Sequence, residues 1–215
     1  MPNDLRERYL ERLSLLEALR ATLERETRDA LSGFSHVDRM SFRVKSADSF
    51  VAKAEEPSNA PAYADPLVEV EDQVAGRVIV FFLGDLKVAR GRLEGTFTTV
   101  ERVERRPSRD AEFGYESDHL ICLIPPHVKP PGWGDREDVP CTFELQLRTL
   151  FMHAYAEPQH EMVYKTAEEI PRQVRRELAW IAASAWGADQ AYERVRTWSD
   201  ASDPRDAVGG ASRRR

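Results

Sequence analysis

The chain has 215 residues, 41% of them hydrophobic, which is enough for one domain with a sizeable core and appended helices. A formal net charge of −6 argues against a broad, sequence-independent grip on nucleic acid, so any phosphate group must be met by a local basic pocket. The two cysteines form no CxxC pair, which favours reduced thiols over a disulfide framework or a structural zinc site. The longest apolar run, VIVFFL, is far short of a membrane span, and the N-terminus has no apolar signal core. We therefore expect a soluble cytoplasmic protein with no membrane partner.

Hydrophobic periodicity predicts alternating helices and strands in the N-terminal half. Residues 4–31 are charged around a leucine stripe, which predicts one long amphipathic helix. The alternating segment MSFRVK predicts a strand, and SADSFVAKAEE predicts a helix capped by Ser46. The near-continuous apolar run GRVIVFFL predicts a strand buried on both faces inside the sheet, followed by a helix from 85 to 93.

Further strands and two helices are expected in the C-terminal half. TFTTVERVE, YESDHLICLI and CTFELQLR each fit a strand, and a loop rich in proline and glycine separates the last two. A helix follows from 149 to about 165. The next helix is longer, with apolar residues at four- and three-residue spacing that predict one packed face: Val174, Leu178, Ile181, Ala185, Ala188, Tyr192 and Val195. Four or five strands with helices on their sides make an α+β fold.

The segment CTFELQLR has a polar face that needs an explanation. Its apolar positions alternate with Thr142, Glu144, Gln146 and Arg148, so these four side chains share one face of the strand. Such a face either meets water, as is common in antiparallel sheets, or lines a site. A glutamate in the middle of a strand is costly over a core but useful beside a metal, where its charge is paired.

A group of cations and hydroxyls suggests phosphate binding. Arg43 and Lys45 leave a strand on one face, Ser46 and Ser49 lie in the first turn of the next helix, and Lys53 lies one turn further on. Cations beside free N–H groups at a helix N-terminus are a natural phosphate site. A solvated strand edge followed by an ordinary capped helix would have the same sequence. Neither GxxxxGKS/T nor GxGxxG occurs, so P-loop and Rossmann phosphate sites are not supported.

Two carboxylates could hold a cation near these residues. Asp72 shortly precedes the interior strand, where a carboxylate is well placed to bind Mg²⁺ carrying a triphosphate. Asp72 matters only if a second carboxylate converges on it, and Glu144 is the candidate. Arg77, just inside the strand, could stack its planar guanidinium on a base. A turn-forming Asp72 and a surface Arg77 fit the sequence equally well. We expect both carboxylates to be exposed, so that neutralising either leaves the fold intact.

Aromatic and histidine side chains are candidates for binding a second ligand. In FGYESDHLI, Tyr115 offers a ring for stacking on a nucleobase and His119 can hydrogen-bond a phosphate or ribose, although a tyrosine near a loop is more often packed. His153 and His160 lie two turns apart on one face of a later helix. No HExxH motif occurs, so we interpret these histidines as facing a substrate pocket, with a structural role for His160 left open.

The order of these motifs resembles one enzyme family. RVKSxxSxxxK is followed by DxxAGRVIV, GYxSxH and FELQLRT, and then by HAYAEPQH and YK. Together they resemble the synthetase domain of the RelA/SpoT alarmone synthetases in its small single-domain form. The resemblance implies a nucleotidyltransferase-like fold, with a mixed sheet of about five strands surrounded by helices. It also implies Mg²⁺-dependent transfer of the β,γ-pyrophosphate of ATP to the 3′-hydroxyl of GDP or GTP, which makes the alarmone (p)ppGpp.

The resemblance assigns roles to individual residues. Asp72 and Glu144 would be catalytic and bind Mg²⁺, and Glu144 could help to deprotonate the attacking hydroxyl. The residues that would bind ATP are Arg43, Lys45, Ser46, Ser49, Lys53 and Arg77. The residues that would bind the acceptor nucleotide are Tyr115, His119, Gln146 and His153.

Two departures from the family motifs leave the acceptor open. Asp118 stands where the family usually has an apolar or aromatic residue, and His153 stands where guanine-specific synthetases often carry Asp or Asn. One alternative is a toxic relative that pyrophosphorylates an adenosine nucleotide or the 3′ end of tRNA, with an antitoxin protein as partner. Another is a non-catalytic nucleotide-binding regulator. The acidic net charge argues mildly against tRNA, and the presence of both carboxylates argues against the regulator.

The expected organisation has four parts. An N-terminal amphipathic helix covers 1–36, a RelA/SpoT-like synthetase domain 37–166, a C-terminal helix packing on that domain 167–200, and a disordered tail 201–215. No hydrolase motif precedes the synthetase region, so we do not expect the chain to degrade its own product. The flanking helices could also form a homo-oligomer or bind a partner, because apolar stripes do not distinguish these roles from packing within one chain.

Overall fold

One mixed sheet of five strands organises the fold. The computed structural model describes it within residues 2–56, 63–105, 113–114, 117–163 and 170–201. The strands are β1 (Val37–Val44), β2 (Val74–Val80), β3 (Thr99–Arg105), β4 (Ser117–Leu123) and β5 (Thr142–Thr149). Their order across the sheet is β1-β2-β5-β4-β3. The neighbours β2 and β5 run parallel, and the other neighbouring pairs are antiparallel. The predicted α+β fold with a mixed, five-stranded sheet is confirmed.

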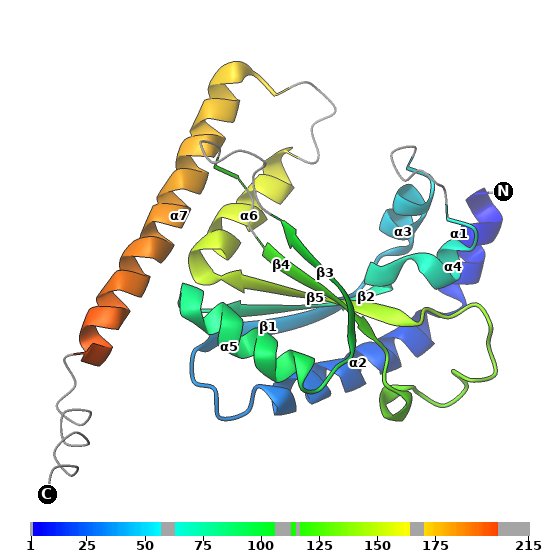
Figure 1. The fold of residues 1–215 in the computed structure, drawn as a ribbon. Coiled ribbons are helices and arrows are strands. Elements are labelled where there is room, and N and C mark those ends of the chain that lie inside the picture. The colour runs from blue at the N-terminus through cyan, green and yellow to red at the C-terminus, as the bar shows by residue number, and fades with distance from the viewer. Residues whose placement is uncertain (1, 57–62, 106–112, 115–116, 164–169, 202–215) are drawn as a thin grey trace, which may run out of the picture.

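Helices cover the two faces of the sheet unequally (Figure 1). On the lower face, α2 (Leu13–Ala30) packs against the edge strand β1 and its neighbour β2, and α5 (Leu83–Glu94) packs against β5 and β2. On the upper face, α6 (Leu150–Val163) contacts β5 and β2 at one end, and α7 (Arg172–Ala201) packs on α6. At the other end lie α1 (Pro2–Leu10) and α3 (Ala47–Ala54), which contact each other. The short helices are α4 (Pro66–Glu69), η1 (Glu71–Gln73) and η2 (Pro126–Val128).

Strand alternation builds the main core beneath the sheet. In β5, Phe143, Leu145 and Leu147 are all fully buried on one face, toward the helices α2 and α5. The interior strand β2 is buried along its length except at Arg77, which is half-buried. The prediction that GRVIVFFL contains an interior strand is therefore confirmed, because both of its faces are covered.

The N-terminal segment forms two helices, where the periodicity predicted one. α1 ends at Leu10 and α2 begins at Leu13, with Arg12 in the turn between them. The side chain of Arg12 is fully buried and hydrogen-bonds to backbone carbonyls of other segments. The apolar spacing continues through the turn, so periodicity alone did not reveal the break.

The face of α7 expected to be packed is largely exposed. Val174, Ile181, Tyr192 and Val195 have 44, 42, 52 and 59% of their surface exposed. Ala185, a small member of the predicted face, is buried as expected, and together with Ala182 it lies in a cluster with Met152 and Tyr155 of α6. Small residues allow α7 to lie close to α6, so the buried face is set by these alanines and the prediction for the larger side chains was wrong.

Within the described ranges, no helix is both long enough and apolar enough to cross a membrane. The expected tail beyond Ala201 lies outside those ranges.

Gly76 lies where three strands meet in the core. It pairs with Phe42 of β1 on one side and with Leu145 of β5 on the other. A Cβ atom at this position would come within 2.6 Å of Phe42 Cε1 and 2.7 Å of Leu145 Cδ2. The glycine in the motif DxxAGRVIV is therefore needed for close packing of side chains across β2.

We expect Gly76→Ala to destabilise the fold by about 1–3 kcal/mol, because packed side chains must shift to admit the methyl group. Gly91→Ala in α5 is the matched control, because nothing lies within 4 Å of its Cβ position. Replacing a glycine inside a helix should stabilise the protein by roughly 0.5–1 kcal/mol. Urea unfolding of both variants measures the difference, and equal effects would contradict the packing argument.

Candidate active site

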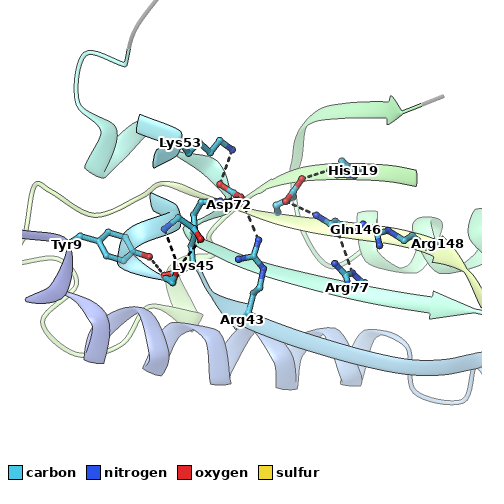
Figure 2. Close-up of polar contacts among 12 residues, drawn as sticks. Tyr9, Arg43, Lys45, Lys53, Asp72, Arg77, His119, Gln146 and Arg148 are labelled. Carbon is cyan, nitrogen blue, oxygen red and sulfur yellow. Dashed lines mark hydrogen bonds and ion pairs between the residues drawn. The ribbon is translucent and has the colours of Figure 1, made fainter. Parts of the chain in front are cut away.

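Asp72 lies in η1, which leads into β2, and cations from two other elements surround it (Figure 2). Lys45, directly after β1, donates from Nζ to Asp72 Oδ2 at 2.6 Å. Lys53 of α3 donates from Nζ to Oδ1 at 2.9 Å. Arg43 Nη2 lies 3.9 Å from Oδ2. One carboxylate therefore joins the end of β1, the helix α3 and the turn before β2.

Asp72 is buried, with 8% of its surface exposed, so the expectation of an exposed carboxylate was wrong. Burial alone would raise the pKa of the Asp72 carboxyl, but the charges and hydrogen bonds of Lys45 and Lys53 outweigh it and hold that pKa below its usual value. Burial likewise opposes the charge of Lys53, yet Asp72 raises the Lys53 pKa overall. The Asp72 carboxylate and the Lys53 ammonium group therefore stay charged near neutral pH.

The first turn of α3 lies beside these cations. Ser46 is the N-cap residue, and its Oγ accepts a hydrogen bond from the Ser49 backbone N–H at 3.2 Å. The Ser46 hydroxyl also contacts Ser49 Oγ at 2.8 Å, and both serines are exposed. The predicted cap is confirmed. The spacing read from RVKSxxSxxxK thus brings cations and a helix N-terminus together at one end of the sheet.

Glu144 of β5 is the second carboxylate of the site. It pairs in register with Ala75 of β2, and η1, which carries Asp72, contacts β5. Glu144 is buried, with 8% of its surface exposed, which again differs from the exposed carboxylate that we expected. Its Oε1 is hydrogen-bonded to Nδ1 of His119, and its Oε2 accepts from Gln146 Nε2 at 3.1 Å.

The pKa of the Glu144 carboxyl depends on burial, on His119 and on Asp72. Burial would raise the pKa of the Glu144 carboxyl, but the hydrogen bond and charge of His119 outweigh it, and the pKa is lowered overall. The negative charge of Asp72 acts in the opposite sense and raises that pKa. The two carboxylates therefore oppose each other's charge, while the contact of η1 with β5 brings the segments that carry them together.

Hydrogen bonds continue from Glu144 across the sheet (Figure 2). Gln146 Oε1 accepts from Arg148 Nη2 at 3.0 Å and from Arg77 Nε at 3.4 Å. Arg77 and Arg148 both pair with Glu157 of α6, the latter at 3.4 Å. The polar face of CTFELQLR therefore lines a connected network between β4 and α6, and Glu144 and Arg148 within it are buried.

Glu157 was missed among the predicted site residues. It lies one helical turn after His153, and its Oε1 is 3.7 Å from His153 Nδ1. Its contact with Arg77 joins residues 80 positions apart, which no local pattern could show. Burial lowers the pKa of His153. The negative charge of Glu157 raises that pKa, but the positive charges of Arg77 and Arg148 lower it further.

The described residues that we expected to bind the acceptor lie on three elements, β4, β5 and α6. His119 and Gln146 lie opposite each other on β4 and β5. His153 lies on α6, with its charged neighbours on β1, β2 and β5. Tyr115 and the side chain of His160 lie outside the described residues.

Asp118 lies on the opposite face of β4 from His119. It is in register with Leu147 of the core face, and it forms ion pairs with Arg90 of α5 at 2.9 Å and with Arg102 of β3 at 3.4 Å. Arg90 and Arg102 therefore neutralise the negative charge of Asp118, the residue that departs from the family motif. Asp118 therefore lies on the opposite face of the sheet from Glu144, which shares the face of His119.

A divalent cation fits the donor set. Within the part of the chain that the structure describes, no group of three or more His, Cys, Asp or Glu side chains could hold a metal ion. Mg²⁺ is commonly bound by one or two carboxylates together with substrate phosphates and water. Asp72 and Glu144 would be the two carboxylates available for a cation that arrives with a nucleotide.

Two buried carboxylates among lysines and arginines on one face of a mixed sheet are typical of an enzyme that binds a polyphosphate with a divalent cation. A family model described as the region found in RelA / SpoT proteins matches residues 42–169, and the chain belongs to this family. A curated relative, GTP pyrophosphokinase YjbM from Bacillus subtilis (strain 168), is 28% identical over 167 residues, which cover 75% of this chain and 73% of the relative.

Solved structures share the fold. The small alarmone synthetase 1 from Bacillus subtilis has a TM-score of 0.76 at 21% identity, covering 91% of this chain and all 100% of the other. The same synthetase bound to its product pppGpp has a TM-score of 0.68 at 24% identity, covering 90% of this chain and 97% of the other.

Acid should weaken the fold through Asp72 and Glu144. Their pKa values are lowered from 3.8 and 4.5 in the folded protein, so their contribution to stability is present above these values and is lost as pH falls below them. We expect the free energy of unfolding to fall between about pH 5 and pH 3. Asp72→Asn should weaken this dependence and cost about 2 kcal/mol near neutral pH, because two lysines lose their counter-charge.

Urea unfolding at several pH values measures this effect. Asp135→Asn removes an exposed carboxylate and is the control. If Asp72→Asn retained the full acid dependence of the wild type, the pairing with Lys45 and Lys53 would not be the source of that stability.

Proposed function

We propose that this protein is a pyrophosphokinase that transfers the β,γ-pyrophosphate of ATP to the 3′-hydroxyl of GDP or GTP, making (p)ppGpp. The observation that carries the proposal is the buried Asp72 paired with Lys45, Lys53 and Arg43, on a turn that contacts the strand of a second buried carboxylate, Glu144. Membership of the RelA/SpoT family supports it. The name of the relative YjbM and the product found in small alarmone synthetase 1 agree with the same chemistry.

ATP is bound at the end of the sheet that carries α3. Arg43, Lys45 and Lys53 face its phosphates, and the first turn of α3, with Ser46 and Ser49, adds N–H and hydroxyl groups. Asp72 and Glu144 would hold Mg²⁺, which would supply positive charge to neutralise the phosphates. The lysines already face Asp72, so a triphosphate meets cations that are held in place before it binds.

Arg77 binds the adenine ring. Its Nε contacts Gln146, and its Nη1 is paired with Glu157, so the guanidinium is held at its edge from two sides. A guanidinium held by its edge keeps its two faces for stacking on a base. Glu157 therefore acts on ATP through Arg77.

The acceptor nucleotide is bound by Tyr115, His119, Gln146 and His153. Its 3′-oxygen attacks the β-phosphorus of ATP, the bond from that phosphorus to the α,β-bridging oxygen breaks, and AMP leaves with the electron pair. The hydroxyl proton passes to the carboxylate of Glu144, which is ionised near neutral pH because its pKa is lowered. The protein performs little covalent chemistry, so positioning and charge account for most of the rate.

The decisive assay offers purified protein Mg²⁺ and γ-labelled ATP with GDP, GTP, ADP and deacylated tRNA in separate reactions. We expect label to move to GDP or GTP. Label that moves only to tRNA or to an adenosine nucleotide would instead identify the toxic branch of the family. Absence of transfer to every acceptor would favour the nucleotide-binding regulator.

Asp72→Asn and Glu144→Gln should each lower turnover by more than about 100-fold. Residues that only orient a metal ligand typically cost up to about 100-fold, and a ligand itself should cost more. Binding of ATP in the absence of a divalent cation should be retained, because the cationic residues remain. The exposed Asp135→Asn variant is the control and should keep full turnover. Full activity in both carboxylate variants would refute the assignment of the metal site.

Arg77→Lys should raise the KM for ATP about tenfold without changing the KM for the acceptor, because the charge is kept but the planar stacking surface is lost. Arg39→Lys is the matched control on the neighbouring strand, since Arg39 is exposed and pairs with Asp38. Initial rates at varied ATP measure the effect. An equal change in the two variants would remove the stacking role of Arg77.

A further inference from the structure

The most completely buried charge in the N-terminal segment is Arg12, which lies outside the region 42–169 that the family model matches. Its Nη1 donates to the carbonyl oxygens of Leu67, at 3.1 Å, and of Asp138. Its Nη2 donates to Gln73 Oε1 at 3.1 Å. One guanidinium thus joins the turn between α1 and α2 to α4, to η1 and to the loop before β5.

Gln73 carries this contact to the candidate metal site. It is fully buried and directly follows Asp72 in η1. Its Nε2 donates to the carbonyl oxygens of Leu67 and Val70, both at 2.9 Å, while its Oε1 faces Arg12. The backbone on both sides of Asp72 is therefore fixed by a buried hydrogen-bond network that begins at Arg12.

A second contact from the N-terminal segment reaches the lysine that pairs with Asp72. Tyr9 Oη donates to the carbonyl oxygen of Lys45 at 2.8 Å, and the Lys45 backbone N–H donates to the Gln73 carbonyl at 2.9 Å. The Tyr9 ring stacks on Phe50 of α3, with centroids 4.1 Å apart, and the Arg12 guanidinium lies over the same Tyr9 ring. The turn between α1 and α2 therefore supports both partners of the ion pair.

Burying a guanidinium costs desolvation free energy, and apolar residues of similar volume often stabilise a core as well or better. Burial lowers the pKa of Arg12 to about 10, which still leaves it charged near neutral pH. Among the described residues no carboxylate lies within ion-pair distance of it; carbonyl and amide oxygens accept from its Nη1 and Nη2, and its buried Nε has no hydrogen-bond partner among these residues. What Arg12 adds over an apolar residue is a rigid fork of N–H donors that fixes three acceptors relative to one another.

We propose that Arg12 is a positioning residue for the metal–ATP site: by holding Gln73 it fixes the turn that aims Asp72 at Lys45, Lys53 and the strand of Glu144. The inference rests on the proposed function, in which Asp72 binds the cation. It makes the N-terminal helices part of the catalytic architecture, whereas residues 1–36 were expected to form a separate helical unit.

The test is the affinity for Mn²⁺, measured by electron paramagnetic resonance in the presence of an ATP analogue with a methylene group between the α- and β-phosphorus atoms. Arg12→Lys keeps the charge but loses the fork, and Gln73→Met keeps the volume but loses the link to Arg12. We expect each variant to bind Mn²⁺ about 10- to 100-fold more weakly, as is usual for residues that orient a metal ligand. The Mg²⁺ concentration needed for half-maximal turnover should rise in parallel, while the KM for the acceptor stays unchanged.

Leu19→Ala is the matched control, because Leu19 is fully buried in α2 and belongs to the core cluster beneath the sheet. It should lower the midpoint of thermal unfolding and leave the Mn²⁺ affinity at the wild-type value. If Arg12→Lys and Gln73→Met lowered only the unfolding midpoint, or if Leu19→Ala weakened Mn²⁺ binding equally, Arg12 would be merely structural. If Arg12→Lys did not fold, the result for Gln73→Met would decide.

The wild-type protein separates this inference from the proposed function. Wild-type protein that binds Mn²⁺ with the analogue but transfers no pyrophosphate would overturn the proposed function and leave the positioning role of Arg12 standing. Wild-type protein that binds no Mn²⁺ with the analogue would overturn both.

Discussion

The ion pair between Asp72 and the two lysines is the constraint on which the rest of the site depends. Lys45 and Lys53 come from different elements, and without the carboxylate their like charges would repel each other inside a partly dehydrated space. The cost of burying Asp72 is offset only while both partners stay in place. The position of α3 against the sheet, the turn before β2 and the direction of the cations are therefore coupled.

The asymmetry of the sheet follows from its two faces. Leucine and phenylalanine side chains on the lower face of β5 require helices to cover them, and α2 and α5 do so. The upper face carries Glu144, Gln146 and Arg148, which hydrogen-bond to one another and to His119, Arg77 and Glu157. A strand that alternates between these environments can be in the core and in the site at once, because neighbouring side chains point to opposite faces.

A protein with an acidic net charge can still bind a polyphosphate if its cations are gathered at one place. Arg43, Lys45 and Lys53 surround a single carboxylate, and Arg77 and Arg148 share Glu157. The cations other than Arg43 are thus hydrogen-bonded to an anion before any ligand is present, which limits the cost of ordering these long side chains when a nucleotide binds. The network that leads from Arg12 through Gln73 to Asp72 extends this pre-organisation into the N-terminal helices.

The sequence by itself determined the strands, the cap at Ser46 and the identity of the charged residues, because alternation and capping are local properties of the chain. It also led to the hypothesis that Asp72 and Glu144 lie together, because binding of Mg²⁺ by the protein calls for a second carboxylate beside Asp72. Only the tertiary structure decided that both are buried, since their burial depends on partners from α3 and β4. It also decided that Arg12 lies inside and that the large residues of α7 lie outside. A charged residue in an amphipathic pattern looks solvent-exposed from its neighbours in sequence, and its burial depends on acceptors that distant segments provide.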